Sequence, residues 1–506
     1  MTIQSGIQAR EVVPWWRSFG AAVRSRELLP LRTSADRVPL RAGVREPMDA
    51  FNRDPGPYTA GDVMGHLIVA GTDDGRAVAA KELLLSSSQA EPRRRLSERM
   101  LAPRGQQTMD DCPDPELDPE RTKRRISLLR ELLTREPRNA IRWADLARAY
   151  AEFGQKVKAR RAILTAAELA PNDRFVVRTA TRAFVHLGEP DTAHDLLLKS
   201  DLLLHDPWLL AAEVAVSSIL DTAPREIRRS RRIVERREVA PWHLSELASA
   251  LATIEWRAGA RKRARKLMLQ ATEEPTDNAL AQAESVAKDG LIEIAPEQMA
   301  RRRAFEARAR YFARAGDAEK AAKYGMLWLA EQPFDTDPAG FTSYVAAAGI
   351  EDFELSLQAA EAGLRANPNY ALLLNNAAYA LINLGRLAEA RKYLDRASGV
   401  SSDSDDRAVL LATSGMLAFR EGDRRAGRKL YDDAIAQLQA PGSEVTVLLA
   451  TMNLAREEIM MGSVDGLDIL RSALRAVEGS KDADVHLAWN RLVSSLDALS
   501  VRLGDS

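Results

Sequence analysis

The stretch from Ala140 to Pro171 constrains the fold of this chain more than any other part of the sequence. Four residues of its first half share the i, i+3, i+4, i+7 spacing of one helix face: Trp143, Leu146, Ala147 and Tyr150. Gly154 follows where a turn is needed, because a residue without a Cβ adopts the left-handed conformation easily. A second helix face ends at a proline and is marked by Ala159, Ile163, Ala166 and Pro171. The stretch predicts an antiparallel helix pair whose backbones approach closely at the alanines.

The same pattern recurs along the chain. Gly154 and Gly188 are 34 residues apart, and the glycines at 316, 349, 385 and 422 follow at steps of 33, 36 and 37. Clean copies cover residues 140–171, 174–207, 302–333, 371–399 and 408–440, whereas residues 207–300 keep only part of the pattern. One helix pair cannot bury its apolar face alone, so neighbouring pairs must stack. We therefore predict an all-α fold, a right-handed α-solenoid of stacked antiparallel helix pairs, over residues 121–480.

With this arrangement of alanine, glycine and aromatic residues, the chain resembles the tetratricopeptide repeat family. The resemblance implies that the first helix of each pair lines a concave groove and that the second helix faces outward. It also implies a scaffold or adaptor for protein–protein interaction, for example as a subunit of a multi-protein bacterial system. Because such repeats host many partners, the fold does not name the partner.

The family geometry assigns a set of arginine, asparagine and aromatic side chains to the groove. They are Arg148, Arg178, Arg182, Arg303, Arg310, Arg314, Asn375, Asn376, Tyr379, Asn383 and Arg420. Guanidinium groups bind carboxylates with two parallel hydrogen bonds, and asparagine amides both donate to and accept from a peptide backbone. The three asparagines resemble those that family members use to hold a peptide main chain, although the lysines that complete such a clamp are not matched. We predict that an acidic or carboxylate-ended segment of another protein binds here; alternatively, the asparagines only bond to neighbouring loops.

Charge composition leaves two other kinds of partner open. The 72 basic and 72 acidic residues give no global field that attracts nucleic acid or an anionic membrane. Runs of arginine at 93–95, 225–238, 261–266 and 301–303 are nevertheless able to contact phosphates. Glutamates interrupt the longest run and aromatic residues are not interleaved, which favours a solvated helix face. A peptide-sensing regulator remains a further alternative, with its effector on a separate chain.

No pattern in the sequence predicts catalysis, a cofactor or a metal. The six histidines include no pair at the spacing of two ligands on one helix face, and no phosphate-cradling glycine loop or nucleophile elbow occurs. The single cysteine, Cys112, lies among carboxylates that disfavour its thiolate. We expect a protein that is not an enzyme.

The two ends of the chain depart from the repeat pattern. Residues 1–120 are predicted as an irregular region with a short helix after Val13, an irregular stretch over 32–57, a degenerate helix pair at about 59–91 and a Pro-rich, charged linker. Trp15 and Trp16 are predicted to cap the first helix pair, with an anchor for another protein as the alternative. Residues 481–506 are predicted to form a capping helix and tail, with self-association as the alternative. No apolar run is long enough for a membrane span, so we expect a cytoplasmic location.

Overall fold

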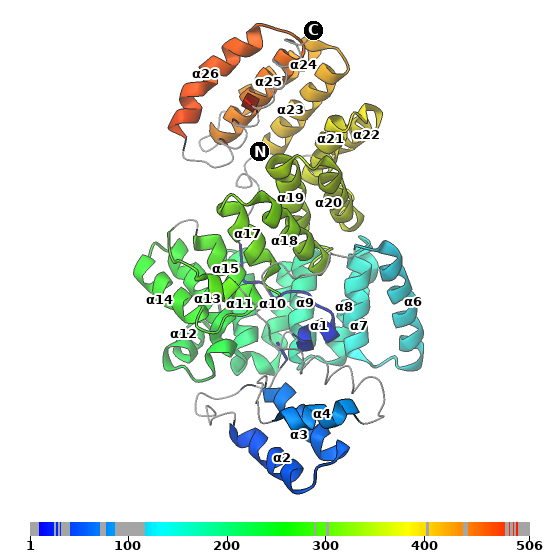
Figure 1. The fold of residues 1–506 in the computed structure, drawn as a ribbon, viewed down its shortest axis with the longest axis vertical. Coiled ribbons are helices and arrows are strands. Elements are labelled where there is room, and N and C mark those ends of the chain that lie inside the picture. Colours follow the sequence, from blue (N-terminus) through cyan, green and yellow to red (C-terminus); the bar gives the residue numbers. More distant parts are fainter. Residues whose placement is uncertain are drawn as a thin grey trace. The chain divides into compact units, whose positions relative to one another are not determined.

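The computed structural model describes residues 10–24, 27–28, 31, 41–70, 77–86, 117–287, 290–299, 303–400, 404–438, 444–480, 485, 489 and 492–493. These residues form helices and no strand (Figure 1). The chain divides into two compact units. The smaller comprises Pro30–Pro113 and Glu235–Pro241, and the larger comprises Met1–Leu29, Asp114–Val234 and Trp242–Ser506. None of the described helices combines the length and apolar character needed to cross a bilayer.

The smaller unit contains α2 (Arg41–Arg53), α3 (Pro57–Ala70) and α4 (Val78–Ser86). Helices α3 and α4 occupy the place of the predicted degenerate pair. The expectation of an irregular stretch over 32–57 is wrong for α2, which includes Pro47. Although a proline inside a helix removes a backbone hydrogen bond, the buried side chains of Met48 and Phe51 pack on α3, where Val63 and Met64 are also buried. This packing stabilises the helix despite the proline.

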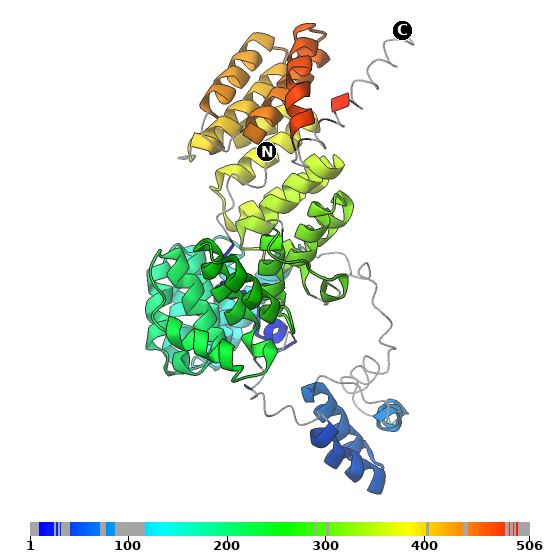
Figure 2. The same ribbon diagram turned by 90° about the vertical axis from the view of Figure 1, so that its left-hand side faces the viewer.

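The larger unit is a succession of antiparallel helix pairs, which confirms the predicted all-α solenoid (Figures 1 and 2). Its helices are α1 (Phe19–Arg24), α6 (Pro119–Arg135), α7 (Ala140–Ala151), α8 (Lys156–Leu169), α9 (Arg174–His186), α10 (Pro190–Lys199), η3 (Asp201–Leu204), α11 (Pro207–Ile219), α12 (Ile227–Arg236, which ends in the smaller unit), α13 (Pro241–Arg257), α14 (Arg261–Ala271), α15 (Asp277–Ala287), α16 (Pro296–Met299), α17 (Phe305–Arg314), α18 (Ala318–Glu331), α19 (Thr336–Tyr344), η4 (Val345–Gly349), α20 (Phe353–Ala366), α21 (Ala371–Asn383), α22 (Leu387–Ser398), α23 (Ser404–Arg420), α24 (Arg424–Gln437), α25 (Glu444–Met460) and α26 (Asp465–Gly479). The clean sequence copies correspond to α7 with α8, α9 with α10, α17 with α18, α21 with α22 and α23 with α24.

Local sequence explains where the pairs begin and turn. Asn139 and Asp173 precede α7 and α9 and accept hydrogen bonds from backbone amides of the first helical turn. Gly154 turns the chain between α7 and α8 with φ +63°. Gly349 differs from the prediction, because it ends η4 in close contact with Ala318, and the left-handed position that follows belongs to Glu351, with φ +54°. The 33-residue step to Gly349 therefore marks a close helix contact and not a turn.

The described residues after α26 pack on the last repeats. Val485 and Leu492 are buried with Leu449 and Met452 of α25 and Val477 of α26. This packing is what a capping helix requires. The remainder of the predicted C-terminal helix lies outside the described residues.

Candidate partner-binding grooves

A segment of the chain itself lies against the predicted groove helices. Residues 10–18 are non-helical and lead into α1; we call residues 10–28 the N-terminal segment. Asn278 of α15 donates a hydrogen bond to the carbonyl oxygen of Val13 at 3.0 Å. Arg148 of α7 donates to the carbonyl oxygen of Trp16 at 2.9 Å. Helices far apart in sequence thus hold the main chain of this segment as a repeat groove would hold a peptide.

Trp16 is the main apolar contact of the segment. Its side chain is fully buried, and its ring centre lies 4.9 Å from that of Phe334 and 6.2 Å from that of His186. For Trp16, the prediction of a cap on the first helix pair is therefore wrong. Because an indole buries more apolar surface between helices than over an exposed end, the tryptophan lies between α9 and the turn after α18.

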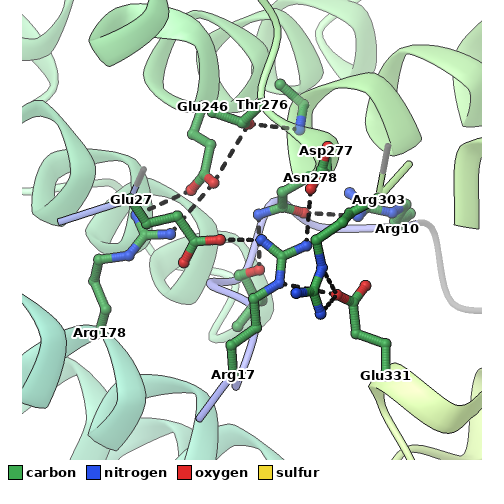
Figure 3. Close-up of polar contacts among 12 residues, drawn as sticks. Arg10, Arg17, Glu27, Arg178, Glu246, Thr276, Asp277, Asn278, Arg303 and Glu331 are labelled. Carbon is green, nitrogen blue, oxygen red and sulfur yellow. Dashed lines mark hydrogen bonds and ion pairs between the residues drawn. The ribbon is translucent and has the colours of Figure 1, made fainter. Parts of the chain in front are cut away.

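Arg17 joins the segment to three acidic side chains. Its guanidinium contacts Glu27, Asp277 at 3.0 Å and Glu331 at 3.2 Å (Figure 3). Burial opposes the charge of this guanidinium, but the three carboxylates outweigh that effect and raise the pKa of Arg17. Arg303 also contacts Glu331, at 2.6 Å. A buried cation with several acidic partners fixes the position of the segment, because removal of one partner leaves uncompensated charge.

Arg10 forms a second polar anchor. Its side chain donates to Asn278 at 2.7 Å (Figure 3), and also to Glu306 at 2.8 Å and to Gln282 at 3.0 Å. Burial alone would raise the pKa of Glu306, but Arg10 and Arg310 together hold it below the usual value. The carboxylate therefore stays ionised between two guanidinium groups.

The six arginines predicted for the first part of the groove bond within the chain. Arg148 bonds to Trp16 and to the carbonyl oxygen of Glu331, Arg178 to Glu246, Arg182 to Asp335, Arg303 to Glu331, Arg310 to Glu306, and Arg314 to Glu284. Sequence reasoning placed the arginines and Glu306 on this surface but missed the other acidic partners, which are Glu246, Glu284, Glu331 and Asp335. It also missed the N-terminal segment. We call this surface, formed by α7, α9, α15 and α17, the first groove; its predicted arginines already have partners.

Contacts between α7–α9 and the end of α18 bring together parts of the chain that are distant in sequence. Arg182 of α9 pairs with Asp335, 153 residues later. A Cβ added to Gly154 would lie 2.8 Å from the carbonyl oxygen of Ala366. The repeats from α7 to α20 therefore close on themselves with the N-terminal segment inside the contact.

The remaining predicted residues belong to a second groove, formed by α19, α21, α23 and α25. This surface contains a cavity of about 150 Å³. Its polar lining includes Asn375, Asn376 and Tyr379, three of the residues predicted to bind a partner, and its apolar lining includes Phe353 and Met416. Asn376 donates to the hydroxyl of Ser343 at 2.8 Å, so its partner lies on the neighbouring helix α19 and not in a loop as the alternative expected.

Two predicted residues do not line this cavity. Asn383 donates back to the carbonyl oxygen of Tyr379 at 2.9 Å, within its own helix. Arg420 pairs with Glu457 at 2.8 Å. Both side chains bond to other residues of the repeat array. The cavity therefore brings together only some of the residues predicted for the groove.

Arg456 of α25 lines the cavity and was not predicted. Its Nε is buried and donates no hydrogen bond, and no ion pair to Arg456 occurs among the described side chains. Tyr379 and Tyr431 lie beside it, and burial raises the pKa of both phenols, which keeps their hydroxyls protonated. The cavity thus combines one unpaired cation with neutral hydrogen-bond donors over an apolar floor. Glu351 contributes an acidic group to the lining.

The arginine runs at 225–238 and 261–266 lie partly on α12 and α14. Arg231 of α12 and Arg263 of α14 both approach Glu255 of α13, at 2.8 and 3.9 Å. Within the larger unit their exposed neighbours are Arg228, Arg232, Arg261, Lys262, Arg265 and Lys266. Within the larger unit, α12 and α14 therefore both contribute basic side chains next to Glu255. Among the described residues no group of three histidine, cysteine or acidic side chains is arranged to hold a metal ion.

Comparison with known proteins finds only distant structural similarity. No protein-family model and no curated protein matches the sequence. Yeast Tom70 matches with 14% identity and a TM-score of 0.31 over 76% of this chain and 93% of that one. The APC/C hetero-tetramer Cut9–Hcn1 matches with 14% identity and a TM-score of 0.35 over 95% and 89%. Human IFIT1, in a dimer with PPP-AAAA, matches with 15% identity and a TM-score of 0.36 over 67% and 90%. By its own succession of antiparallel helix pairs the chain is an all-α helical repeat protein.

Proposed function

We propose that this protein is a scaffold or adaptor that binds a partner polypeptide in the second groove. The observation that carries the proposal is Arg456, an unpaired guanidinium beside an apolar cavity. The first groove is a poorer candidate, because its predicted arginines bond to acidic side chains and to the N-terminal segment. An open groove with an unpaired donor is the place where a partner gains interactions without breaking existing ones.

The lining indicates what such a partner presents. An apolar side chain fits the floor near Phe353 and Met416, and a carboxylate fits the fork of Arg456. Asn375 and Asn376, side by side on α21, supply amides for a peptide main chain. We infer a segment with an apolar residue next to an acidic side chain or a C-terminal carboxylate. Glu351 disfavours a second acidic residue near its own carboxylate.

The test is selection of peptides with free C-termini on the full-length protein, followed by fluorescence anisotropy of the enriched peptides. The expected peptides combine an apolar residue with a carboxylate. Arg456→Gln should weaken them at least tenfold, because a hydrogen bond to a charged group contributes about 1.5–3 kcal/mol. Arg386→Gln is the matched control, since Arg386 pairs with Glu389 on the exposed side of α22. Equal affinities of both variants for every selected peptide would remove the second groove from consideration.

A second candidate function, association with nucleic acid, is favoured by the basic surface on α12 and α14. Phosphates reward clustered arginine and lysine without base contacts. Neutralising Z phosphates on duplex DNA gives a log–log slope of affinity against salt near −0.9Z. Reversal of charge at Arg232 and Arg265, both exposed, should flatten that slope. Affinity that does not change with salt would exclude this function.

A further inference from the structure

A second cavity, separate from the second groove, is lined by an unusual number of arginines. It has a volume of about 470 Å³ and lies where the N-terminal segment meets α6, α7, the end of α18 and α20. Its arginines are Arg17, Arg121, Arg125, Arg148, Arg303 and Arg365. Its acidic residues are Asp118, Glu152 and Glu331. Basic groups thus outnumber acidic groups two to one in the lining.

The arginines differ in how fully they are bonded. Arg17 and Arg303 share Glu331, and Arg148 pairs with Glu152. These three hold the fold together.

Two arginines on different walls keep most of their hydrogen-bonding capacity. Arg365, in the last turn of α20, makes no hydrogen bond or ion pair among the described residues. Arg125, on α6, approaches one oxygen of Asp145 at 3.6 Å. A guanidinium has five N–H donors in a planar fork, so both side chains have donors left for a ligand.

The electrostatic setting is consistent with an anion in this cavity. Burial lowers the pKa of Arg148, and the neighbouring charge of Arg125 lowers it further. Partial burial also lowers the pKa of Arg365. Burial therefore removes hydration from Arg148 and Arg365, and Arg125 also repels Arg148; a bound anion would offset these effects.

We propose that this cavity binds a small phosphate-bearing anion, with Arg365 and Arg125 as its principal ligands. Planar guanidinium forks match the oxygens of phosphate in bidentate fashion. The volume admits more than a single inorganic phosphate, because one water occupies about 30 Å³ of liquid. The preferred ligand therefore carries at least two phosphate groups. This site is independent of partner binding in the second groove.

The experiment is isothermal titration calorimetry of the full-length protein with inorganic pyrophosphate, ATP and citrate at low ionic strength. Citrate carries comparable negative charge on carboxylates and distinguishes phosphate recognition from general anion attraction. Pyrophosphate or ATP should bind more tightly than citrate. Arg365→Gln and Arg125→Gln should each weaken that binding at least tenfold, while Arg365→Lys, which keeps the charge without the fork, should give an intermediate loss.

Two controls make the result decisive. Arg386→Gln removes an arginine that pairs with Glu389 and does not line the cavity, so it should leave binding unchanged. Circular dichroism melting should show that the Arg365 and Arg125 variants remain folded, since neither side chain is in the buried core. Absence of heat up to millimolar pyrophosphate and ATP, tighter binding of citrate, or affinity unchanged in Arg365→Gln would each overturn the proposal.

Discussion

Replacing Trp16 with alanine tests whether the N-terminal segment is an integral part of the repeat array. The indole is fully buried between His186 and Phe334. Truncation of a buried aromatic residue costs about 3–5 kcal/mol, and the lost ring contacts are included in that range. Because repeat arrays transmit a local loss mainly to neighbouring pairs, the effect should concentrate in α9 and in the turn after α18.

The structure also predicts the outcome of a milder change at the same position. The indole Nε1 of Trp16 is buried without a hydrogen-bond partner. Trp16→Phe removes that unsatisfied donor, whose burial costs about 1–3 kcal/mol, while it leaves a smaller ring and a partial void. The two effects oppose each other, so Trp16→Phe should be much less destabilising than Trp16→Ala.

The assay combines urea denaturation with hydrogen exchange read by mass spectrometry. Trp16→Ala should accelerate exchange in α7, α9 and α18 and leave α23 to α26 unchanged. Trp256→Ala is the control, because this indole on α13 is only partly buried. Equal stability of Trp16→Ala and Trp256→Ala, or a uniform rise of exchange along the chain, would show that the N-terminal segment does not stabilise the helices of the first groove.

Three further predictions concern single positions. Burial, with a contribution from Arg182, lowers the pKa of His186 to about 4. In the unfolded chain a histidine has a pKa near 6.5, so the unfolded state binds the proton at a higher pH than the folded state. The free energy of unfolding therefore falls by about 3 kcal/mol as the pH drops from about 6.5 to 4. His186→Phe should flatten this part of the pH profile of the urea midpoint, and an unchanged slope would show that the histidine is not responsible. Gly154→Ala should lower the melting temperature more than Gly188→Ala. Both glycines have positive φ, but only at Gly154 would the new Cβ meet a carbonyl oxygen, that of Ala366 at 2.8 Å. Equal melting temperatures of the two variants would contradict this contact. Ala390→Arg should lower the free energy of unfolding in urea by about 1–3 kcal/mol or more, because Ala390 is fully buried. A variant as stable as the wild type would refute the assigned register of α22.

The repeats could be predicted because their signal is local. Ala147, Ala159 and Ala390 are buried where the helix spacing placed them. The pattern failed where packing overrides it: Pro47 lies inside α2, and Gly349 ends η4 at a close contact with Ala318. Neither outcome follows from residue spacing alone.

The N-terminal segment could not be placed from sequence, because its contacts join distant residues. Arg10 and Glu306 are 296 positions apart, and Arg17 and Glu331 are 314 apart. Glutamates at inward positions of α17 and α18 were the available signal, since buried acidic side chains need cationic partners.

In the second groove, part of the cavity lining belongs to the residues predicted from sequence, and partner binding there stays a prediction. Asn375, Asn376 and Tyr379 line the cavity because the register of α21 was assigned correctly. Arg456 was missed because the recognisable copies ended at residue 440, before α25 begins. A repeat that has lost its consensus residues still contributes a groove-facing helix.

The long separation between the N-terminal segment and its contacts has a consequence for synthesis. A ribosome makes Trp16 early, whereas Phe334, its ring partner, is added more than three hundred residues later. Throughout that interval the indole lacks its native surroundings, and loop closure over such a distance is slow relative to formation of adjacent helix pairs. We therefore expect helix pairs such as α7 with α8 to form during translation, and the first turn of the array to lock only when α18 has emerged.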